Sequence, residues 1–195
     1  MKLTTTTMVT VDGVMQGLGG PDEDRSGGFE RGGWVTHSFD NEAMTFLNQV
    51  YARADAFLFG RRTYEIFAGS WGTWDDPGDS PIWTALHTLP KYVASTTPLD
   101  PTWANTTVIS SDVEAAIRDL KARGSGNIYI SGSGTLVRAL LADGLIDELH
   151  LFVYPVVVGG GKKTLFLDAS PTTRFRLNDS HVYTNGVVHL NYGPA

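Results

Sequence analysis

The sequence contains no cysteine. This absence excludes disulfide bonds, thiolate zinc sites, iron–sulfur clusters and a cysteine nucleophile, so the fold must be stabilised by packing alone. Basic residues are also scarce, because 15 Lys and Arg oppose 21 Asp and Glu and leave a formal net charge of −6. A protein without a positively charged surface does not attract the phosphate backbone of nucleic acids, and we therefore expect no nucleic-acid partner.

Long hydrophobic runs are missing as well. The longest near-continuous apolar stretch, residues 151–158, is interrupted by Pro155 and is too short to cross a bilayer. The first three residues and the four threonines after them lack the apolar segment of a signal peptide. We therefore expect a cytoplasmic protein that has no membrane partner.

Patterns of metal ligands are weak. The five histidines have no His-x-x-x-His spacing and no flanking acidic pattern. Asp75, Asp76 and Asp79 surround Pro77 and Gly78, a composition that describes a turn at least as well as a cation site. We assign no metal.

The rest of the composition is that of an ordinary folded protein. Of the 195 residues, 42% are hydrophobic and 18% are charged, which suits one domain, residues 1–195, with a full core. Two β-turn-α units are the clearest elements. An apolar strand over 56–59 leads through Gly60 into a helix, and a strand over 127–130 leads through residues 131–134 into a second helix.

The C-terminal part predicts a different pairing. Asn185-Gly186 is a strong hairpin signal between the runs over 174–183 and 187–192. Helices that alternate with strands in the middle of the chain imply parallel strands that are covered on both faces. The sequence therefore predicts an α/β protein, a three-layer α/β/α sandwich with a mixed, mostly parallel central sheet and a C-terminal antiparallel hairpin.

A glycine-rich segment separates the first strand from the first helix. Residues 16–33 hold seven glycines, Pro21 and a mixed cluster of charges. This composition is too flexible and polar for a regular element in the core, so it predicts a long loop. Long loops on compact domains are often functional, and the sequence leaves open whether this one acts as a lid.

Two corners between a strand and a helix are suited to anions, because ligands of parallel α/β sheets bind beyond the carboxyl ends of strands. At the first corner Gly60 permits close approach, Thr63 offers a hydroxyl, and Arg61 and Arg62 can grip phosphate. At the second corner the amides of residues 131–134 could hold another phosphate. The alternatives are a solvated arginine pair and an ordinary tight turn.

Five sequence segments together resemble one protein family. The resemblance runs in consistent order from about Lys2 to Tyr192, and it is specific for the whole set although not for any single segment. The segments are Val9-Thr10-Val11-Asp12-Gly13, Leu58-Phe59-Gly60-Arg61-Arg62-Thr63-Tyr64-Glu65, Lys91-Tyr92-Val93-Ala94-Ser95, Ile128-Tyr129-Ile130-Ser131-Gly132-Ser133-Gly134, and Asp147-Glu148-Leu149 with Pro155-Val156-Val157-Val158-Gly159. The set resembles the dihydrofolate reductase-like family, and more narrowly the stand-alone relatives of the reductase (C-terminal) domain of the riboflavin-biosynthesis bifunctional deaminase-reductase.

The resemblance implies an NADPH-dependent oxidoreductase, similar to dihydrofolate reductase and 5-amino-6-(5-phosphoribosylamino)uracil reductase. Such an enzyme would transfer a hydride to a small heterocycle, pteridine- or pyrimidine-like, or to a carbonyl or imine. Gly60, Arg61 and Thr63 would hold the pyrophosphate of NADPH, and Ser95 and Thr96 would lie near the adenosine 2′-phosphate. The other side of the cofactor would run along Ser131, Gly132, Ser133, Gly134, Thr135 and Leu136.

Coenzyme preference is a separate question. No basic residue follows Ser95 directly, so a preference for NADPH over NADH would rest on Arg61 and Arg62, with Lys91 as a third candidate.

The resemblance also implies where the substrate lies. Thr10 and Asp12 would sit where the nicotinamide meets the substrate. Hydride transfer to a carbonyl or imine goes with proton delivery, which Asp12 or its bound water could supply, although an Asp before Gly13 also fits a simple turn. Trp34 and Trp71 could stack on a flat heterocycle or belong to the core.

Two departures from the family pattern concern the substrate. Counting back from Gly60, Met44 stands where dihydrofolate reductases carry the carboxylate used against the pterin, so reduction of dihydrofolate itself is not expected. Ser131 stands where the resembled riboflavin reductases commonly carry an acidic residue. These departures keep a second hypothesis open, a non-catalytic dinucleotide-binding protein of the same fold.

The apolar run Leu149–Val158 is longer than one face of a monomeric sheet needs. The resembled relatives often pair through such strands. We therefore expect a homodimer.

Overall fold

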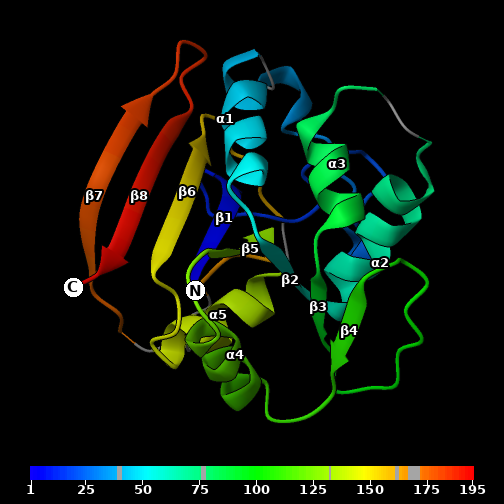
Figure 1. Cartoon of the computed structure of the whole chain (residues 1–195). Helices are drawn as coiled ribbons and strands as arrows, with labels where there is room; N and C mark the ends of the chain where they lie inside the picture. Colours follow the sequence, from blue (N-terminus) through cyan, green and yellow to red (C-terminus); the bar gives the residue numbers. More distant parts are fainter. Residues whose placement is uncertain (39–40, 76–77, 132, 161–162, 167–171) are drawn as a thin grey trace.

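The computed structural model describes residues 1–38, 41–75, 78–131, 133–160, 163–166 and 172–195 (Figure 1). Within them, eight strands form one sheet in the order β4-β3-β2-β5-β1-β6-β8-β7. The strands are β1 (Lys2–Thr10), β2 (Ala56–Gly60), β3 (Lys91–Ala94), β4 (Thr106–Ile109), β5 (Asn127–Ser131), β6 (Glu148–Tyr154), β7 (Phe175–Val182) and β8 (Val188–Pro194). β8 runs antiparallel to β6 and β7, and the other pairings are parallel. The predicted mixed sheet and C-terminal hairpin are confirmed.

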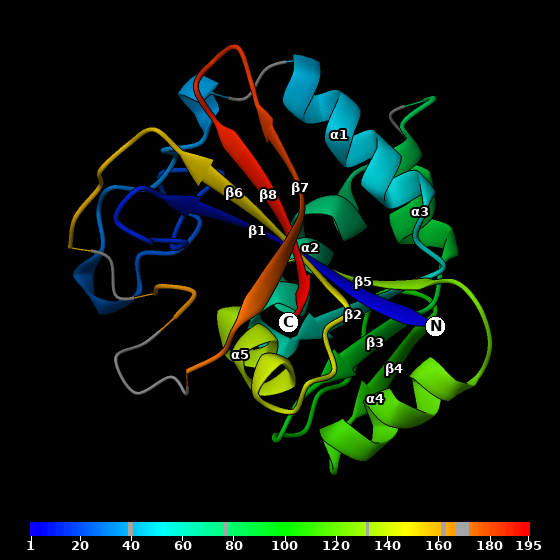
Figure 2. The ribbon, with the colours of Figure 1, turned by 90° about the vertical axis from the view of Figure 1, so that its left-hand side faces the viewer.

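Helices cover both faces of the sheet (Figure 2). They are α1 (Asn41–Ala52), α2 (Arg61–Ser70), α3 (Pro81–Thr88), α4 (Val113–Ala122) and α5 (Gly134–Ala142), with the short 3-10 helices η1 (Ser26–Gly28), η2 (Thr36–Ser38) and η3 (Trp71–Thr73). Neighbouring residues of a strand point to opposite faces. Phe57 and Tyr129 therefore pack with α1, α2 and α3, while Leu58 and Ile130 pack with α4 and α5. The predicted three-layer sandwich is confirmed.

The predicted loop over residues 16–33 is also confirmed, since η1 is its one regular element. Phe29 of this loop and Trp34 just after it pack in a hydrophobic cluster with Phe152 and Tyr154 of β6. The loop is thus fastened to the sheet by its own apolar side chains. Among the helices of the described residues, none has the length and apolar character that crossing a membrane requires.

The threonines of β1 are buried. Thr4 Oγ1 donates a hydrogen bond to Asn127 Oδ1 at 2.6 Å. Thr5 and Thr7 are 0% and 2% exposed, and their hydroxyls have no hydrogen-bond partner in the part of the chain that the structure describes. Burying an unpaired hydroxyl costs about 1–3 kcal/mol. These two positions therefore lower the stability of the fold.

We expect Thr5→Val and Thr7→Val each to raise the free energy of unfolding by about 1 kcal/mol, because valine keeps the β-branched shape and removes the unpaired hydroxyl. Thr4→Val is the matched control and should lower stability, since it leaves Asn127 Oδ1 without its donor. Urea denaturation measures all three variants. Equal losses at the three positions would contradict the prediction and show that all these hydroxyls are paired in solution.

Candidate functional site

The two predicted anion corners meet at one edge of the sheet. β2 and β5 are adjacent parallel strands, so their carboxyl ends lie side by side. β2 leads through Gly60 into α2, and β5 leads through Ser133 into α5. A Cβ atom on Gly60 would lie 3.1 Å from Ser133 Cβ and closer still to Ser133 Oγ, so the two corners are in contact. The first-turn amides of two helices, which have no carbonyl partner within their own helix, therefore lie close to the same region.

The second corner is tightly built. Ser133 has a φ of 60°, in the left-handed region, and precedes Gly134, where a Cβ atom would lie 2.8 Å from Met15 Sδ. Thr135 is exposed, whereas Leu136 is buried in the core. Of these two residues, only Thr135 therefore presents its side chain to solvent. Gly132 lies outside the described residues, as do Asp76 and Pro77 of the acidic turn.

Arg61 reaches toward the turn after β3. Its Nε lies 2.7 Å from Glu65 Oε1, and its Nη1 donates to Thr97 Oγ1. Ser95, which is buried, donates from Oγ to the Thr97 carbonyl oxygen at 2.7 Å, while Thr96 is exposed. The structure thus brings Arg61 to the turn that holds Ser95 and Thr96.

A groove with a volume of about 590 Å³ runs beside the start of α2. It is lined by Glu23, Arg61, Arg62, Glu65 and Ile66. The groove is shallow and open to solvent, and its lining combines two guanidinium groups with two carboxyl groups. Because Glu23 belongs to the loop over residues 16–33, this loop forms one wall of the groove.

Asp12 is held by three hydrogen bonds. Its Oδ1 accepts from Thr10 Oγ1 at 2.6 Å and from the Val158 amide at 3.2 Å, and its Oδ2 accepts from the Gly159 amide at 2.8 Å. The bond from Thr10, together with those two amides, holds the pKa of Asp12 below its ordinary value. The carboxylate is therefore ionised at neutral pH, and it ties the end of β1 to the segment after β6.

The two candidate tryptophans lie in different surroundings. Trp34 is only 8% exposed, its Nε1 donates to the Gln16 carbonyl oxygen at 2.9 Å, and its ring packs edge-on against Tyr154. Trp71 is half-buried and lies 5.2 Å, between ring centroids, from Trp74, which is 53% exposed. Of the two candidates, Trp71 thus belongs to a ring pair that a ligand could reach.

The suggestion that Lys91 contacts the cofactor is wrong. Lys91 is the first residue of β3 and lies at the opposite end of that strand from Ser95. Its Nζ is buried, donates to the carbonyl oxygens of Leu86 and Leu89 at 2.6 and 3.0 Å, and lies 4.9 Å from the centroid of the Trp103 ring. This burial lowers the pKa of Lys91 to about 8. The lysine therefore satisfies carbonyl groups at the C-terminal end of α3.

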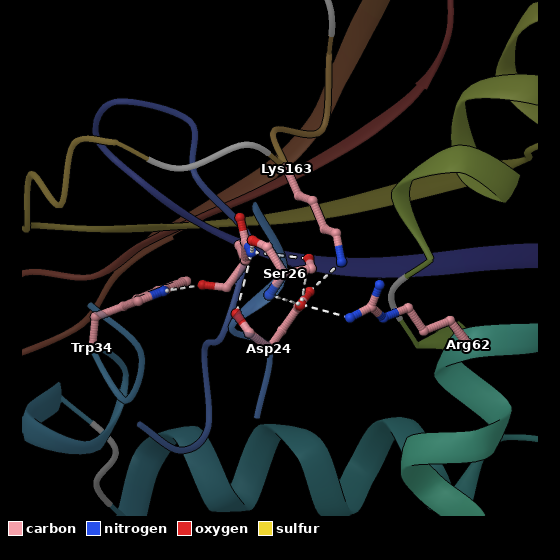
Figure 3. Close-up of polar contacts among 6 residues, drawn as sticks. Asp24, Ser26, Trp34, Arg62 and Lys163 are labelled. Atoms are coloured by element: carbon pink, nitrogen blue, oxygen red, sulfur yellow. Dashed lines mark hydrogen bonds and ion pairs between the residues drawn. The ribbon is translucent and has the colours of Figure 1, made fainter. Parts of the chain in front are cut away.

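Sequence reasoning did not identify Asp24 and Lys163 as part of this region. Asp24 forms ion pairs with Arg62 of α2 and with Lys163, which follows β6 (Figure 3). Its local sequence, Asp22-Glu23-Asp24, indicates only an acidic loop. No local pattern links residues so far apart in the chain, so this cluster could be found only in the folded structure.

Comparison with known proteins gives consistent relationships. The family model of the RibD C-terminal domain matches residues 1–189. The uncharacterized protein YyaP of Bacillus subtilis (strain 168) is 27% identical over 190 residues, covering 94% of this chain and 90% of that protein.

Solved structures show the same fold. A candidate riboflavin biosynthesis protein from Shewanella sp. PV-4 has a TM-score of 0.74 at 21% identity, over 100% of this chain and 99% of that one. Dihydrofolate reductase from Enterococcus faecalis, complexed with NADP(H), has a TM-score of 0.61 at 14% identity, over 98% and 95%. The predicted dihydrofolate reductase-like fold is therefore confirmed.

Proposed function

The chain belongs to the RibD C-terminal domain family, and we propose that residues 1–195 form one NADPH-dependent reductase domain. Its substrate is a small heterocycle, pteridine- or pyrimidine-like, or a related carbonyl or imine. The observation that carries this proposal is the contact between Gly60 and Ser133, which joins two helix N-termini beside Arg61. Helix N-termini attract anions and guanidinium groups bind phosphate, so this edge suits the diphosphate of a dinucleotide.

The residues present fit this cofactor. Gly60 is buried, and a side chain at this position would meet the side chain of Ser133, so glycine allows the two corners to approach each other closely. In the proposal Gly60, Arg61 and Thr63 bind the pyrophosphate, and the turn with Ser95 and Thr96 receives the 2′-phosphate. The second corner contributes backbone amides and the hydroxyls of Ser131, Ser133 and Thr135. The bound cofactor supplies the hydride.

Asp12 forms the polar end of the proposed substrate site, and Thr10, which is 1% exposed, positions its carboxylate through the 2.6 Å hydrogen bond from Oγ1. Because Asp12 is ionised, it does not carry the proton itself; in the proposal its carboxylate would orient a water molecule that relays a proton from bulk solvent to the reduced substrate. Trp71 offers a ring face for a flat substrate. We leave Trp34 out of the substrate contacts, because its side chain is enclosed in the core.

A non-catalytic dinucleotide-binding protein is the alternative. Met44 of α1 is 38% exposed and carries no charge where dihydrofolate reductases hold a carboxylate. Ser131 likewise offers no acid at the second corner. A protein with this pattern could retain the cofactor site after losing its substrate site.

Titration of the protein with NADPH, followed by a panel of pteridines, pyrimidines and quinones, tests both functions. Loss of the near-ultraviolet absorbance of the reduced nicotinamide, dependent on one panel member, is the result expected of a reductase. Energy transfer from tryptophan to bound NADPH without oxidation by any panel member would favour the binding protein. Absence of NADPH binding would contradict both.

We further propose that the domain is a homodimer formed through the outer half of the sheet. Leu151 of β6 lies beside Leu190 of β8, and Val153 lies beside Val188. Val182 of β7 continues this row and is 69% exposed. A second copy that covered this face would remove apolar surface from water.

We expect light scattering to give twice the mass of a single chain at micromolar concentration. Val182→Asp should weaken the dimer by more than tenfold, because it buries an unpaired charge in an apolar contact. Thr84→Asp, on the exposed side of α3, is the control that should leave the mass unchanged. A monomeric wild-type protein would refute the dimer.

A further inference from the structure

A buried carboxylate lies between two cations beside the proposed phosphate site (Figure 3). Asp24 Oδ1 accepts from Arg62 Nη2 at 2.7 Å, and Asp24 Oδ2 accepts from Lys163 Nζ. The side chain of Asp24 is 9% exposed, whereas those of Arg62 and Lys163 are 58% and 36% exposed. The two cations are therefore open to solvent while the anion that pairs them is enclosed.

The loop over residues 16–33 holds Asp24 in this position. Ser26 donates to Asp24 Oδ1 from its hydroxyl at 2.7 Å and from its amide at 3.2 Å. Gln16 Nε2 donates to the carbonyl oxygens of Asp24 and Ser26 at 3.2 and 2.8 Å, and Trp34 Nε1 donates to the Gln16 carbonyl oxygen. The carboxylate is thus presented by a preformed network that extends to the hydrophobic core.

Asp24 is charged in this network. Burial raises the pKa of Asp24, but the hydrogen bonds and charge of Lys163 and the bonds from Ser26 outweigh it and leave the pKa below its ordinary value. A carboxylate and a phosphate present the same kind of charged acceptor oxygens to arginine and lysine. Arg62 and Lys163 therefore form an anion-binding site that the carboxylate of Asp24 occupies.

The cluster of Asp24, Arg62 and Lys163 lies beside the groove. Arg62 lines the groove together with Arg61, and so does Glu23, the neighbour of Asp24. The amide of Met15 donates a hydrogen bond to the carbonyl oxygen of Lys163. The side chain of Met15 in turn lies against Gly134 of the second corner. The cluster therefore borders both corners of the proposed cofactor site.

We propose that Arg62 and Lys163 form an anion subsite that Asp24 fills in the free protein and that a ligand phosphate takes over. This inference deepens the proposed function and rests on it for the identity of the molecule that carries the phosphate. When phosphate binds Arg62 and Lys163, Asp24 leaves them, and the loop over residues 16–33 loses its ionic fastening to α2 and to the segment after β6. Asp24 thus competes with the ligand and couples phosphate binding to the opening of the loop.

Calorimetric titration with inorganic pyrophosphate tests the competition directly. Asp24→Asn removes the internal charge, and it should bind pyrophosphate about tenfold more tightly than the wild type. Asp22→Asn is the matched control: Asp22 lies in the same loop, is 79% exposed and pairs with Arg25, so its affinity should equal that of the wild type. Unchanged or weaker binding by Asp24→Asn would overturn the proposal and leave Asp24 as a fastening of the loop alone.

Hydrogen exchange of the wild-type protein supplies a second measurement that does not require the variant to fold. Amides of residues 16–33 should exchange several-fold faster with saturating pyrophosphate than without it, and slower or equal exchange would overturn the displacement of Asp24.

Inorganic phosphate is the second probe in the calorimetric titration. If Asp24→Asn gains tenfold in affinity for pyrophosphate but not for phosphate, the natural ligand carries a diphosphate. An equal gain in affinity for phosphate identifies a phosphate monoester.

Pyrophosphate carries no nicotinamide, so the two proposals can fail separately. Tighter pyrophosphate binding by Asp24→Asn in a protein that never binds NADPH would retain the anion subsite and refute the reductase. Oxidation of NADPH by a protein whose Asp24→Asn variant binds pyrophosphate no better than the wild type would retain the reductase and refute the subsite.

Discussion

NADPH binding is expected to weaken by more than tenfold when Arg61 is replaced with alanine and Thr63 with valine. Arg61 is the first residue of α2 and its guanidinium is already oriented by Glu65 and by Thr97. Hydrogen bonds to charged groups contribute about 1.5–3 kcal/mol each, and about 1.4 kcal/mol corresponds to a tenfold change in affinity. Isothermal titration calorimetry measures the change. An unaltered dissociation constant would remove both residues from the cofactor site.

The single variant Arg61→Ala separates the two phosphate groups. Because the proposal assigns Arg61 to the pyrophosphate, which both coenzymes carry, its loss should weaken NADPH and NADH by similar factors. A much larger loss for NADPH would contradict this assignment and place Arg61 at the 2′-phosphate, beside the turn that holds Ser95 and Thr96. Arg118→Ala is the control, since Arg118 forms a similar exposed pair with Glu114 on α4, in the opposite layer. This variant should leave both affinities unchanged.

The architecture could be predicted because its signals are local. The strand of β2 is buried along its whole length, which its unbroken apolar sequence indicates for a strand covered on both faces. The turn at Asn185-Gly186 was likewise readable, since Gly186 has a φ of 84° and its amide donates to the Tyr183 carbonyl oxygen. Hydrophobic periodicity and turn chemistry depend on residues that are close together in the sequence, so they can be recognised without knowledge of the tertiary structure.

The partners of charged side chains could not be predicted in the same way. Lys91 has the sequence context of a strand residue near a binding edge, yet it is buried against the end of α3. Arg62 pairs with Asp24, 38 residues earlier in the chain. Long side chains find partners through the packing of distant elements, and the same packing encloses Trp34 in the core. The candidate corners were therefore predictable, whereas the side chains that border them were not.

Gly60→Ala is expected to destabilise the protein by about 1–3 kcal/mol, because overpacking at a tight contact forces the side chain of Ser133 or the backbone to move. The new Cβ would lie 3.1 Å from Ser133 Cβ and closer to its hydroxyl oxygen. Gly69→Ala, in α2, is the control: no neighbouring atom approaches its added Cβ, and alanine favours the helix, so stability should rise by up to about 1 kcal/mol. A Gly60→Ala variant as stable as Gly69→Ala would contradict the contact between the corners.

The double variant Gly60→Ala/Ser133→Gly separates packing from binding. Ser133→Gly removes both atoms that the new methyl group meets, and it places glycine at a φ of 60°, which glycine adopts without strain. Urea denaturation should therefore show recovery of most of the lost stability. Because Ser133→Gly also removes a hydroxyl that the proposal assigns to the cofactor, the NADPH affinity of the double variant is compared with that of the single variant Ser133→Gly. It should stay more than tenfold below that value, because the methyl group at residue 60 still stands between the two corners. If affinity returned together with stability, Gly60 would be required only for packing, and the phosphate would bind elsewhere along the groove.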